Sequence, residues 1–310
     1  MLDVKRLDEI LGQDKVVDYL RHDLATGRFN HAYMFLGMRG IGKKALALSF
    51  AKSILCANPG GEGFCGSCSS CRRFDQETYS EFLPFFDEGE TLKIEQIRRI
   101  IEEEHFKKFE GRFRIIFIEH AERMTNQAGN ALLKVLEEPL PGTIFIFTAT
   151  NGDEILPTIL SRVEKYHLNT LKPRDLKTIL KGMGYDEVPY LTLGTIDEAK
   201  VLLENRDEDL MDYGQFKAFI REKNLESVFV LADKLSRKPY LRELLSYYQL
   251  EAAASYKESL RAGTKERRMD RRCLLAIDEA LGKIKRNINT IHSLEYCFLT
   301  IGGIFSEQNL

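Results

Sequence analysis

Residues 32–44 read AYMFLGMRGIGKK, and this segment gives the clearest indication of the fold. Its first five residues are apolar and end at a glycine, which predicts a buried strand over 32–36. The next seven, 37–43, fit the pattern G-x-x-x-x-G-K of a phosphate-binding loop, and a helix is expected from Lys43 to about Cys56. In this order of strand, loop and helix, glycines let backbone N–H groups turn toward a phosphate at the helix N-terminus.

The position after the loop departs from the pattern. A Ser or Thr hydroxyl normally binds the magnesium of a bound nucleoside triphosphate there, but this chain has Lys44, which offers no acceptor oxygen. We therefore expect Gly37, Gly40, Gly42 and Lys43 to form a degenerate loop that does not support ATP turnover. Two interpretations of Lys43 stay open, a phosphate-neutralising lysine and a solvated lysine at a helix start, and weak nucleotide binding stays open with the first.

The pattern on either side predicts an α/β domain. Apolar runs at 115–118 and 144–147 predict two more buried strands, and a shorter strand is expected near 166–168. Between the first two, residues 127–138 have the apolar spacing of a helix that Pro139 ends. Strands that alternate with helices predict a mainly parallel sheet covered on both faces.

Helical spacing takes over after Lys172. We expect three domains: the α/β domain over 1–170, a small helical domain over 171–225, and an all-α bundle over 226–310. Stripes at i, i+3, i+4 and i+7 predict the helices of the last domain, for example at Val228, Leu231, Ala232 and Leu235.

Composition gives no global signal for nucleic acid or membrane, because 45 basic and 47 acidic residues leave a net charge of -2. No apolar run approaches the ~20 residues that span a bilayer. The N-terminus also lacks the apolar segment of a secretion signal. We therefore expect a cytoplasmic protein without membrane contact, whose six cysteines are not disulfide-bonded.

Four cysteines follow the predicted loop helix with the spacing C-x8-C-x2-C-x2-C. Thiolates so close in sequence suit a closed, tetrahedral, structural zinc site, and an iron–sulfur cluster is the weaker alternative. The zinc-binding insertion is expected over 56–71, with Cys56, Cys65, Cys68 and Cys71 as ligands. The other two cysteines lie among apolar residues and are expected to be buried small side chains.

Together these motifs resemble bacterial DNA polymerase III clamp-loader subunits, which have the AAA+ fold with a RecA-like domain, a helical lid and a C-terminal collar that joins the subunits. The resemblance rests on the loop with its cysteine quartet, on Leu11-Gly12-Gln13, on the segment 130–139 (NALLKVLEEP) and on 156–163 (LPTILSRV). The last segment resembles the family's Ser-Arg-Cys motif, with Val163 in place of the cysteine. The resemblance implies a zinc module at the quartet.

Three departures resemble the family's non-hydrolysing subunit type, delta-prime, more than its ATP-binding gamma or tau types. Lys44 replaces the metal ligand. Glu119 and His120 follow the strand 115–118 where an ATPase of the family carries an Asp-Glu pair. Asp197 stands where the helical domain supplies an arginine to the nucleotide, and a carboxylate there would repel a triphosphate.

Arg162 of the Ser-Arg motif is retained. The resemblance implies an arginine finger, a catalytic residue that acts in trans on the ATP of a neighbouring subunit. The alternative is a structural ion pair at a domain edge. The implied partners are gamma or tau and delta subunits, and, through the assembly, the sliding clamp and primer-template DNA. An ATP-hydrolysing gamma/tau-like subunit with unusual metal coordination is the alternative function, and a metal-dependent DNA-binding adaptor is a third.

Overall fold

The computed structural model describes residues 4–86, 111–185, 194–205, 225–264, 267–286 and 288–303, with the single positions Leu92, Glu95, Ile97 and Phe216. The chain divides into two compact units, Met1–Leu171 and Lys172–Leu310, and each is described by itself. Among the described helices, none is long and apolar enough to cross a membrane.

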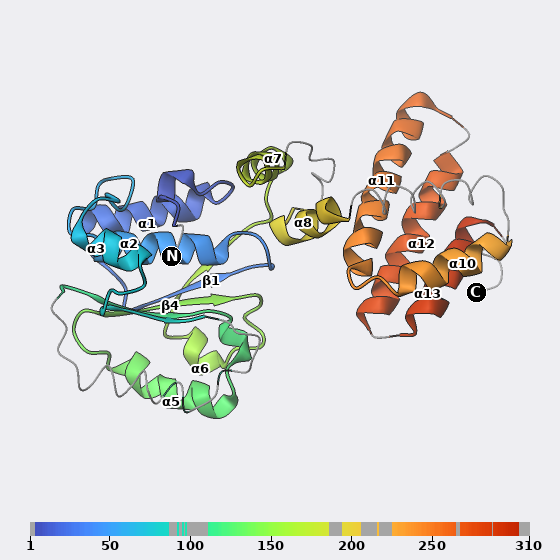
Figure 1. Ribbon diagram of the computed structural model, residues 1–310. Coiled ribbons are helices and arrows are strands. Elements are labelled where there is room, and N and C mark those ends of the chain that lie inside the picture. The colour runs from blue at the N-terminus through green and yellow to red at the C-terminus, as the bar shows by residue number, and fades with distance from the viewer. Residues whose placement is uncertain are drawn as a thin grey trace. The chain divides into compact units, whose positions relative to one another are not determined.

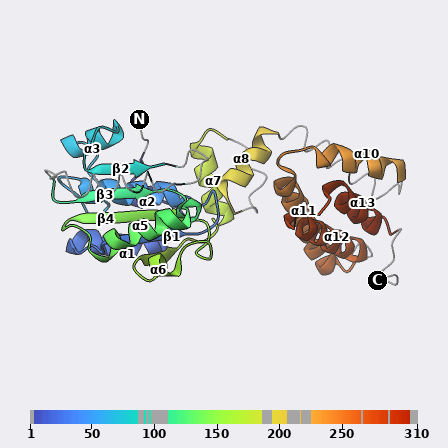
Figure 2. The ribbon, with the colours of Figure 1, turned by 90° about the horizontal axis from the view of Figure 1, so that it is seen from below.

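The first unit contains a five-stranded sheet in the order β2-β3-β4-β1-β5, with every neighbouring pair parallel (Figure 2). The parallel α/β prediction is therefore confirmed, and the predicted strands lie within or overlap β1, β3, β4 and β5. Strand β2 was missed because Pro84 interrupts its apolar run; an edge strand tolerates a residue without N–H. The bounds are β1 Ala32–Leu36, β2 Phe82–Phe85, β3 Arg114–Ile118, β4 Thr143–Ala149 and β5 Glu164–His167.

Helices cover both faces of this sheet (Figure 1). On one face lie α1 (Asp14–Thr26), α2 (Lys43–Leu55) and α3 (Ser69–Asp75), and on the other lie α5 (Asn126–Glu137) and α6 (Pro157–Leu160). Short 3-10 turns are found at η1 (Leu7–Glu9) and η2 (Ala121–Arg123). The predicted loop helix and the helix before Pro139 are thus confirmed, the second shifted by one residue.

The three inner strands, β3, β4 and β1, are buried along their whole length and are largely apolar because both of their faces are covered, whereas the edge strand β5 is polar and mostly exposed. Successive side chains of a strand point to opposite faces, so Tyr33 and Phe35 pack with Phe50 of α2, whereas Met34 packs with Leu132 of α5. The sheet therefore separates two cores, and α2 and α5 are fixed on opposite sides of it.

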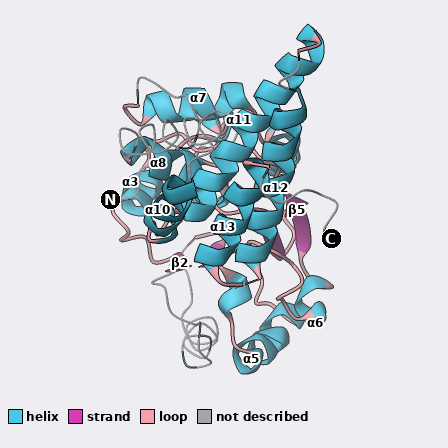
Figure 3. Ribbon diagram, turned by 90° about the vertical axis from the view of Figure 1, so that its right-hand side faces the viewer, coloured by secondary structure: helices cyan, strands magenta, loops and turns pink. Residues whose placement is uncertain are grey.

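The described elements of the second unit are helices, some of which lie alongside one another (Figure 3). One apolar core joins α10–α13 and also contains Leu202 of α8. Cys273 and Cys297 are buried in that core, as predicted, and burial raises the pKa of the Cys273 thiol to about 12. The bounds are α7 Pro173–Gly182, α8 Ile196–Glu204, α10 Leu225–Ser236, α11 Leu241–Ala262, α12 Arg267–Lys285 and α13 Thr290–Ile301.

Candidate functional site

The glycine-rich loop joins β1 to α2 and requires glycine at two positions. Gly37 has φ +151°, and a Cβ there would lie 2.8 Å from the carbonyl oxygen of Leu168 and 2.5 Å from Cδ1 of Ile41. Gly42, the N-cap of α2, has φ +94°, in the region that side chains disfavour. The loop thus has a phosphate-loop-like path at the carboxyl end of β1.

Lys43 is turned back onto this loop. Its Nζ donates to the carbonyl oxygens of Gly37 at 2.6 Å and Met38 at 2.7 Å, and the residue is 7% exposed. The interpretation of Lys43 as a solvated lysine is therefore wrong. Its ammonium is held by the loop's own backbone.

Lys44 pairs with the first residue after β3. Its Nζ lies 2.8 Å from Oε2 of Glu119 and 4.4 Å from the centre of the Phe86 ring. The Glu119 side chain is only 10% exposed, so the ammonium neutralises a nearly buried carboxylate. A positive group of the chain itself therefore contacts the carboxylate that follows β3.

A second polar network lies beside this pair, past the carboxyl ends of β3 and β4. His120 has φ +53°, and its Nδ1 lies 3.0 Å from Oε1 of Glu122. The hydroxyl of Thr150 donates to the same oxygen at 2.7 Å, and the Thr150 N–H does so at 3.2 Å. Burial works to raise the pKa of Glu122, but the hydrogen bonds from His120 and Thr150 outweigh it and lower that pKa.

Glu122 and Thr150 are not among the candidate residues that the sequence predicts. Their positions shortly after two apolar runs could have indicated that they lie close together, because the carboxyl ends of neighbouring parallel strands meet at one edge of a sheet. His120, which replaces the expected catalytic carboxylate, is thus engaged by a carboxylate of its own turn.

We expect Glu122→Gln to destabilise the first unit by about 1 to 2 kcal/mol at pH 7, because it removes an ionised acceptor of several hydrogen bonds. Since folding lowers the pKa of Glu122, its ionised form stabilises the fold above the ordinary glutamate pKa, and this contribution is lost as pH falls through the folded-state pKa. Urea unfolding at pH 7, 5, 4 and 3 measures the difference from the wild type, which should shrink in acid. Exposed Glu154→Gln is the matched control; a difference independent of pH would contradict the assignment.

Arg162 follows α6 at the start of the approach to β5. Its Nη2 lies 2.6 Å from Oε1 of Glu137, and its Nη1 donates to the Thr158 carbonyl at 2.8 Å and to the Ser161 hydroxyl at 3.2 Å. The Arg162 side chain is about one-third exposed and lines a hollow of about 440 Å³. The ion pair expected under the structural alternative is therefore present, and it lies at the surface.

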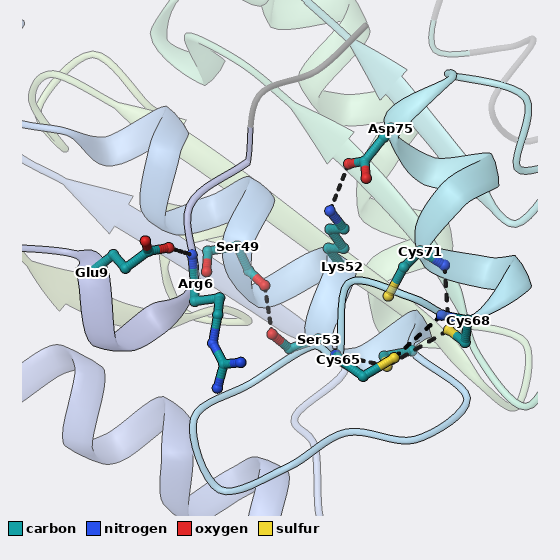
Figure 4. Close-up of polar contacts among 10 residues, drawn as sticks. Arg6, Glu9, Ser49, Lys52, Ser53, Cys65, Cys68, Cys71 and Asp75 are labelled. Carbon is teal, nitrogen blue, oxygen red and sulfur yellow. Dashed lines mark hydrogen bonds and ion pairs between the residues drawn. The ribbon is translucent and has the colours of Figure 1, made fainter. Parts of the chain in front are cut away.

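The four predicted zinc ligands come together. Their Sγ atoms all lie within 4.8 Å of one another, and those of Cys56 and Cys68 are 3.9 Å apart. Tetrahedral zinc with bonds of about 2.3 Å requires sulfurs about 3.8 Å apart, so the arrangement fits such an ion. Three of these side chains are labelled in Figure 4, where Cys65, Cys68 and Cys71 converge.

Backbone geometry favours thiolates in this cluster. The N–H groups of Cys65, Cys68 and Cys71 donate to the sulfurs of Cys56, Cys65 and Cys68 at 3.3 to 3.4 Å. Backbone N–H groups of Ser67 and Cys68 lower the pKa of Cys65 to about 6, whereas burial raises the pKa of Cys56 and Cys71. A bound cation would stabilise all four thiolates, which suits a closed structural site without a position for water.

The cysteine module is attached to the loop helix α2. Lys52 of α2 pairs with Asp75 of α3 at 2.6 Å, and its ammonium also lies 3.9 Å from the centre of the Phe64 ring (Figure 4 shows the ion pair). Phe64 packs with Cys56 and Cys71. The Lys52 side chain is 4% exposed, so this contact between the two elements is buried.

Asp197 lies in the second unit, exposed in the first turn of α8. Thr195 is the N-cap, and its hydroxyl accepts from the N–H of Glu198 at 3.4 Å. Carboxylates in a first turn interact favourably with the helix dipole, which is a local reason for Asp197 at this position.

A parallel α/β unit with a phosphate-loop-like turn and a four-cysteine cluster defines a P-loop-type protein with a module able to hold a metal ion. The family model described as DNA polymerase III, delta subunit, matches residues 12–172, which contain the loop, the cysteines and Arg162. The match covers more than half of the chain, which therefore belongs to this family.

The chain is also similar to curated proteins. It is 32% identical over 187 residues to DNA polymerase III subunit tau/gamma of Haemophilus influenzae, across 60% of this chain and 27% of that protein. It is 31% identical to DNA polymerase III subunit tau of Escherichia coli, across 58% of this chain and 28% of that one. The chain thus spans about a quarter of the length of these relatives.

The chain is also similar to two solved structures of Thermotoga maritima. A DNA polymerase III gamma-subunit-related protein of Thermotoga maritima has a TM-score of 0.46 and 19% identity, covering 92% of this chain and 98% of its own. The RuvB Holliday junction branch migration motor of the same organism has a TM-score of 0.47 and 15% identity, covering 98% and 92%.

Proposed function

We propose that this chain is a non-hydrolysing, delta-prime-like subunit of the DNA polymerase III clamp loader. In this proposal it assembles with gamma or tau and delta subunits, helps load the sliding clamp onto primer-template DNA, and offers Arg162 to the ATP site of a neighbour. The family membership of residues 12–172 supports the assembly.

The observation that carries the non-hydrolysing role is the Lys44–Glu119 ion pair. Magnesium at a phosphate loop needs a hydroxyl after the loop lysine and a carboxylate at the end of another strand of the sheet, which here is β3. Here an ammonium stands at the first position and neutralises the group at the second. At the position where the family's ATPases carry the carboxylate that activates water, this chain has His120, which contacts Glu122.

The proposal also assigns the domains. Residues 1–170 would be the RecA-like domain with a zinc module at 56–71, 171–225 the helical lid, and 226–310 the collar that joins the subunits. The core that joins α10–α13 supports a folded helical bundle in the last segment.

A gamma/tau-like ATPase is the second candidate, and the names of the similar curated proteins favour it. It would require Lys44 to leave Glu119 and magnesium to be bound without the usual hydroxyl. The two candidates therefore differ in what the isolated chain does with ATP.

We expect the purified chain alone to show no magnesium-dependent ATP binding by calorimetry and no phosphate release above a protein-free blank. A gamma-type subunit purified in the same way is the positive control. Addition of gamma-type and delta-type subunits should yield a stable complex with ATPase activity. Turnover by the isolated chain would favour the gamma/tau-like candidate, and failure to assemble would contradict the clamp-loader role.

A further inference from the structure

The Arg162 guanidinium is held at three points by its own subunit. Two of the acceptors, the Thr158 carbonyl and the Ser161 hydroxyl, are neutral and lie within four residues of it. The third is the Glu137 carboxylate, 25 residues away in sequence and on a different helix. Glu137 therefore links Arg162 to helix α5, whereas the other two contacts are made within the same local turn.

Glu137 is well placed for this purpose. It is the last residue of α5, whose other face packs into the core beneath the sheet through Leu132, Val135 and Leu136. Its carboxylate thus extends from a helix that is packed against the core, and its side chain is half-exposed. Such an ion pair orients a guanidinium and leaves the arginine accessible, because neither side chain is fully buried. An exposed pair of this kind is also weak.

The contacts leave part of the guanidinium for a ligand. Arginine has five N–H donors in a planar fork, and three protein acceptors engage its two Nη atoms. Within the described part of the chain, Nε makes no hydrogen bond, and Arg162 lines the hollow of about 440 Å³. A fork fixed on one side and free on the other is suited to contact a phosphate oxygen.

We propose that Glu137 is a positioning residue that orients Arg162 toward the nucleotide phosphates of a neighbouring subunit. This inference rests on the proposed function, since it requires Arg162 to act in trans. Orientation, rather than charge, is the contribution: the carboxylate oxygen fixes Nη2, and an amide oxygen at the same place would fix it as well.

The test uses the complex assembled with gamma-type and delta-type subunits, with the rate and KM of ATP hydrolysis measured at saturating primed DNA and clamp. Glu137→Ala should lower kcat by about 5-fold, well below the ~10³-fold attributed to a whole finger, with little change in KM. Glu137→Gln, which keeps an oxygen acceptor, should retain most of the wild-type rate. Glu138→Ala is the matched control: the neighbouring residue is also acidic and exposed, and should leave the rate unchanged.

Variants of Arg162 separate the two proposals. In an Arg162→Ala background, Glu137→Ala should have no further effect, because there is no guanidinium left to orient. If Arg162→Ala itself leaves the rate unchanged, the trans arginine of the proposed function is wrong. If Arg162→Ala lowers the rate but Glu137→Ala does not, or if Glu137→Ala raises it, the positioning role is wrong. Thermal unfolding of each variant before assembly tests whether a lower rate of ATP hydrolysis comes from a loss of folding.

Discussion

If Arg162 acts in trans as proposed, Arg162→Ala should slow ATP hydrolysis at the neighbouring subunit's site by about 10³-fold, the magnitude of a trans arginine in other nucleotide hydrolases. A guanidinium stabilises negative charge as it develops on the transferred phosphoryl group, and alanine leaves that charge to water. Single-turnover hydrolysis by the assembled complex measures the effect, because the phase contributed by that site should disappear while others persist.

The design needs a charge control and a surface control. Arg162→Lys keeps the charge but loses the planar fork, so it should restore only part of the rate. Lys165→Ala removes an exposed cation on the adjacent strand β5 and should change nothing. Since the Arg162–Glu137 pair is exposed, its loss costs at most about 1 kcal/mol of stability. All phases unchanged in Arg162→Ala would show that the pair is structural only.

Cys71→Ser should abolish stoichiometric metal binding and unfold the segment between α2 and β2. Structural zinc supplies folding free energy directly, with apparent values of about 10 to 16 kcal/mol in small zinc peptides. Cys71 and Cys56 are buried beside Phe64, and these three residues form the buried part of a small apolar cluster. Without the ion, little more than this small cluster holds their thiols together. Elemental analysis measures the metal content, and hydrogen exchange over residues 56–75 measures the unfolding.

Cys297→Ala is the matched control for this experiment, because it removes a buried cysteine of the second unit, outside the cluster. It should retain the metal. A strong chelator should reproduce the exchange pattern of Cys71→Ser in the wild-type protein. Full protection of 56–75 in the metal-free protein would show that packing alone holds the module, and the metal would then be dispensable for folding.

Much of the fold follows from local patterns. Apolar runs such as 32–36 predict buried strands because every residue of a parallel strand covered on both faces loses water, and Pro139 limits the helix before it because proline cannot continue one. Strand β2 was not predicted in this way, because a proline such as Pro84 normally interrupts a strand. The proline is tolerated there only because β2 lies at the edge of the sheet.

The candidate site divides in the same way. The cysteine quartet and the departure at Lys44 are short-range patterns, in which spacing or residue type alone carries the chemistry. The partners of Lys44 and Arg162 are long-range: Glu119 lies 75 residues from Lys44, and Glu137 lies 25 from Arg162. A sequence pattern gives no information about the distance in space between residues so far apart along the chain.

Local sequence patterns were thus sufficient to predict a parallel α/β domain, a phosphate loop without its hydroxyl and a four-thiol cluster, because periodicity and close spacing act within one turn or strand. The contacts of Lys44 with Glu119, of Lys43 with its own loop and of Glu137 with Arg162 became known from the folded structure alone. Ion pairs and hydrogen bonds act over a few ångströms in space, and the packing of the sheet determines which distant residues come that close.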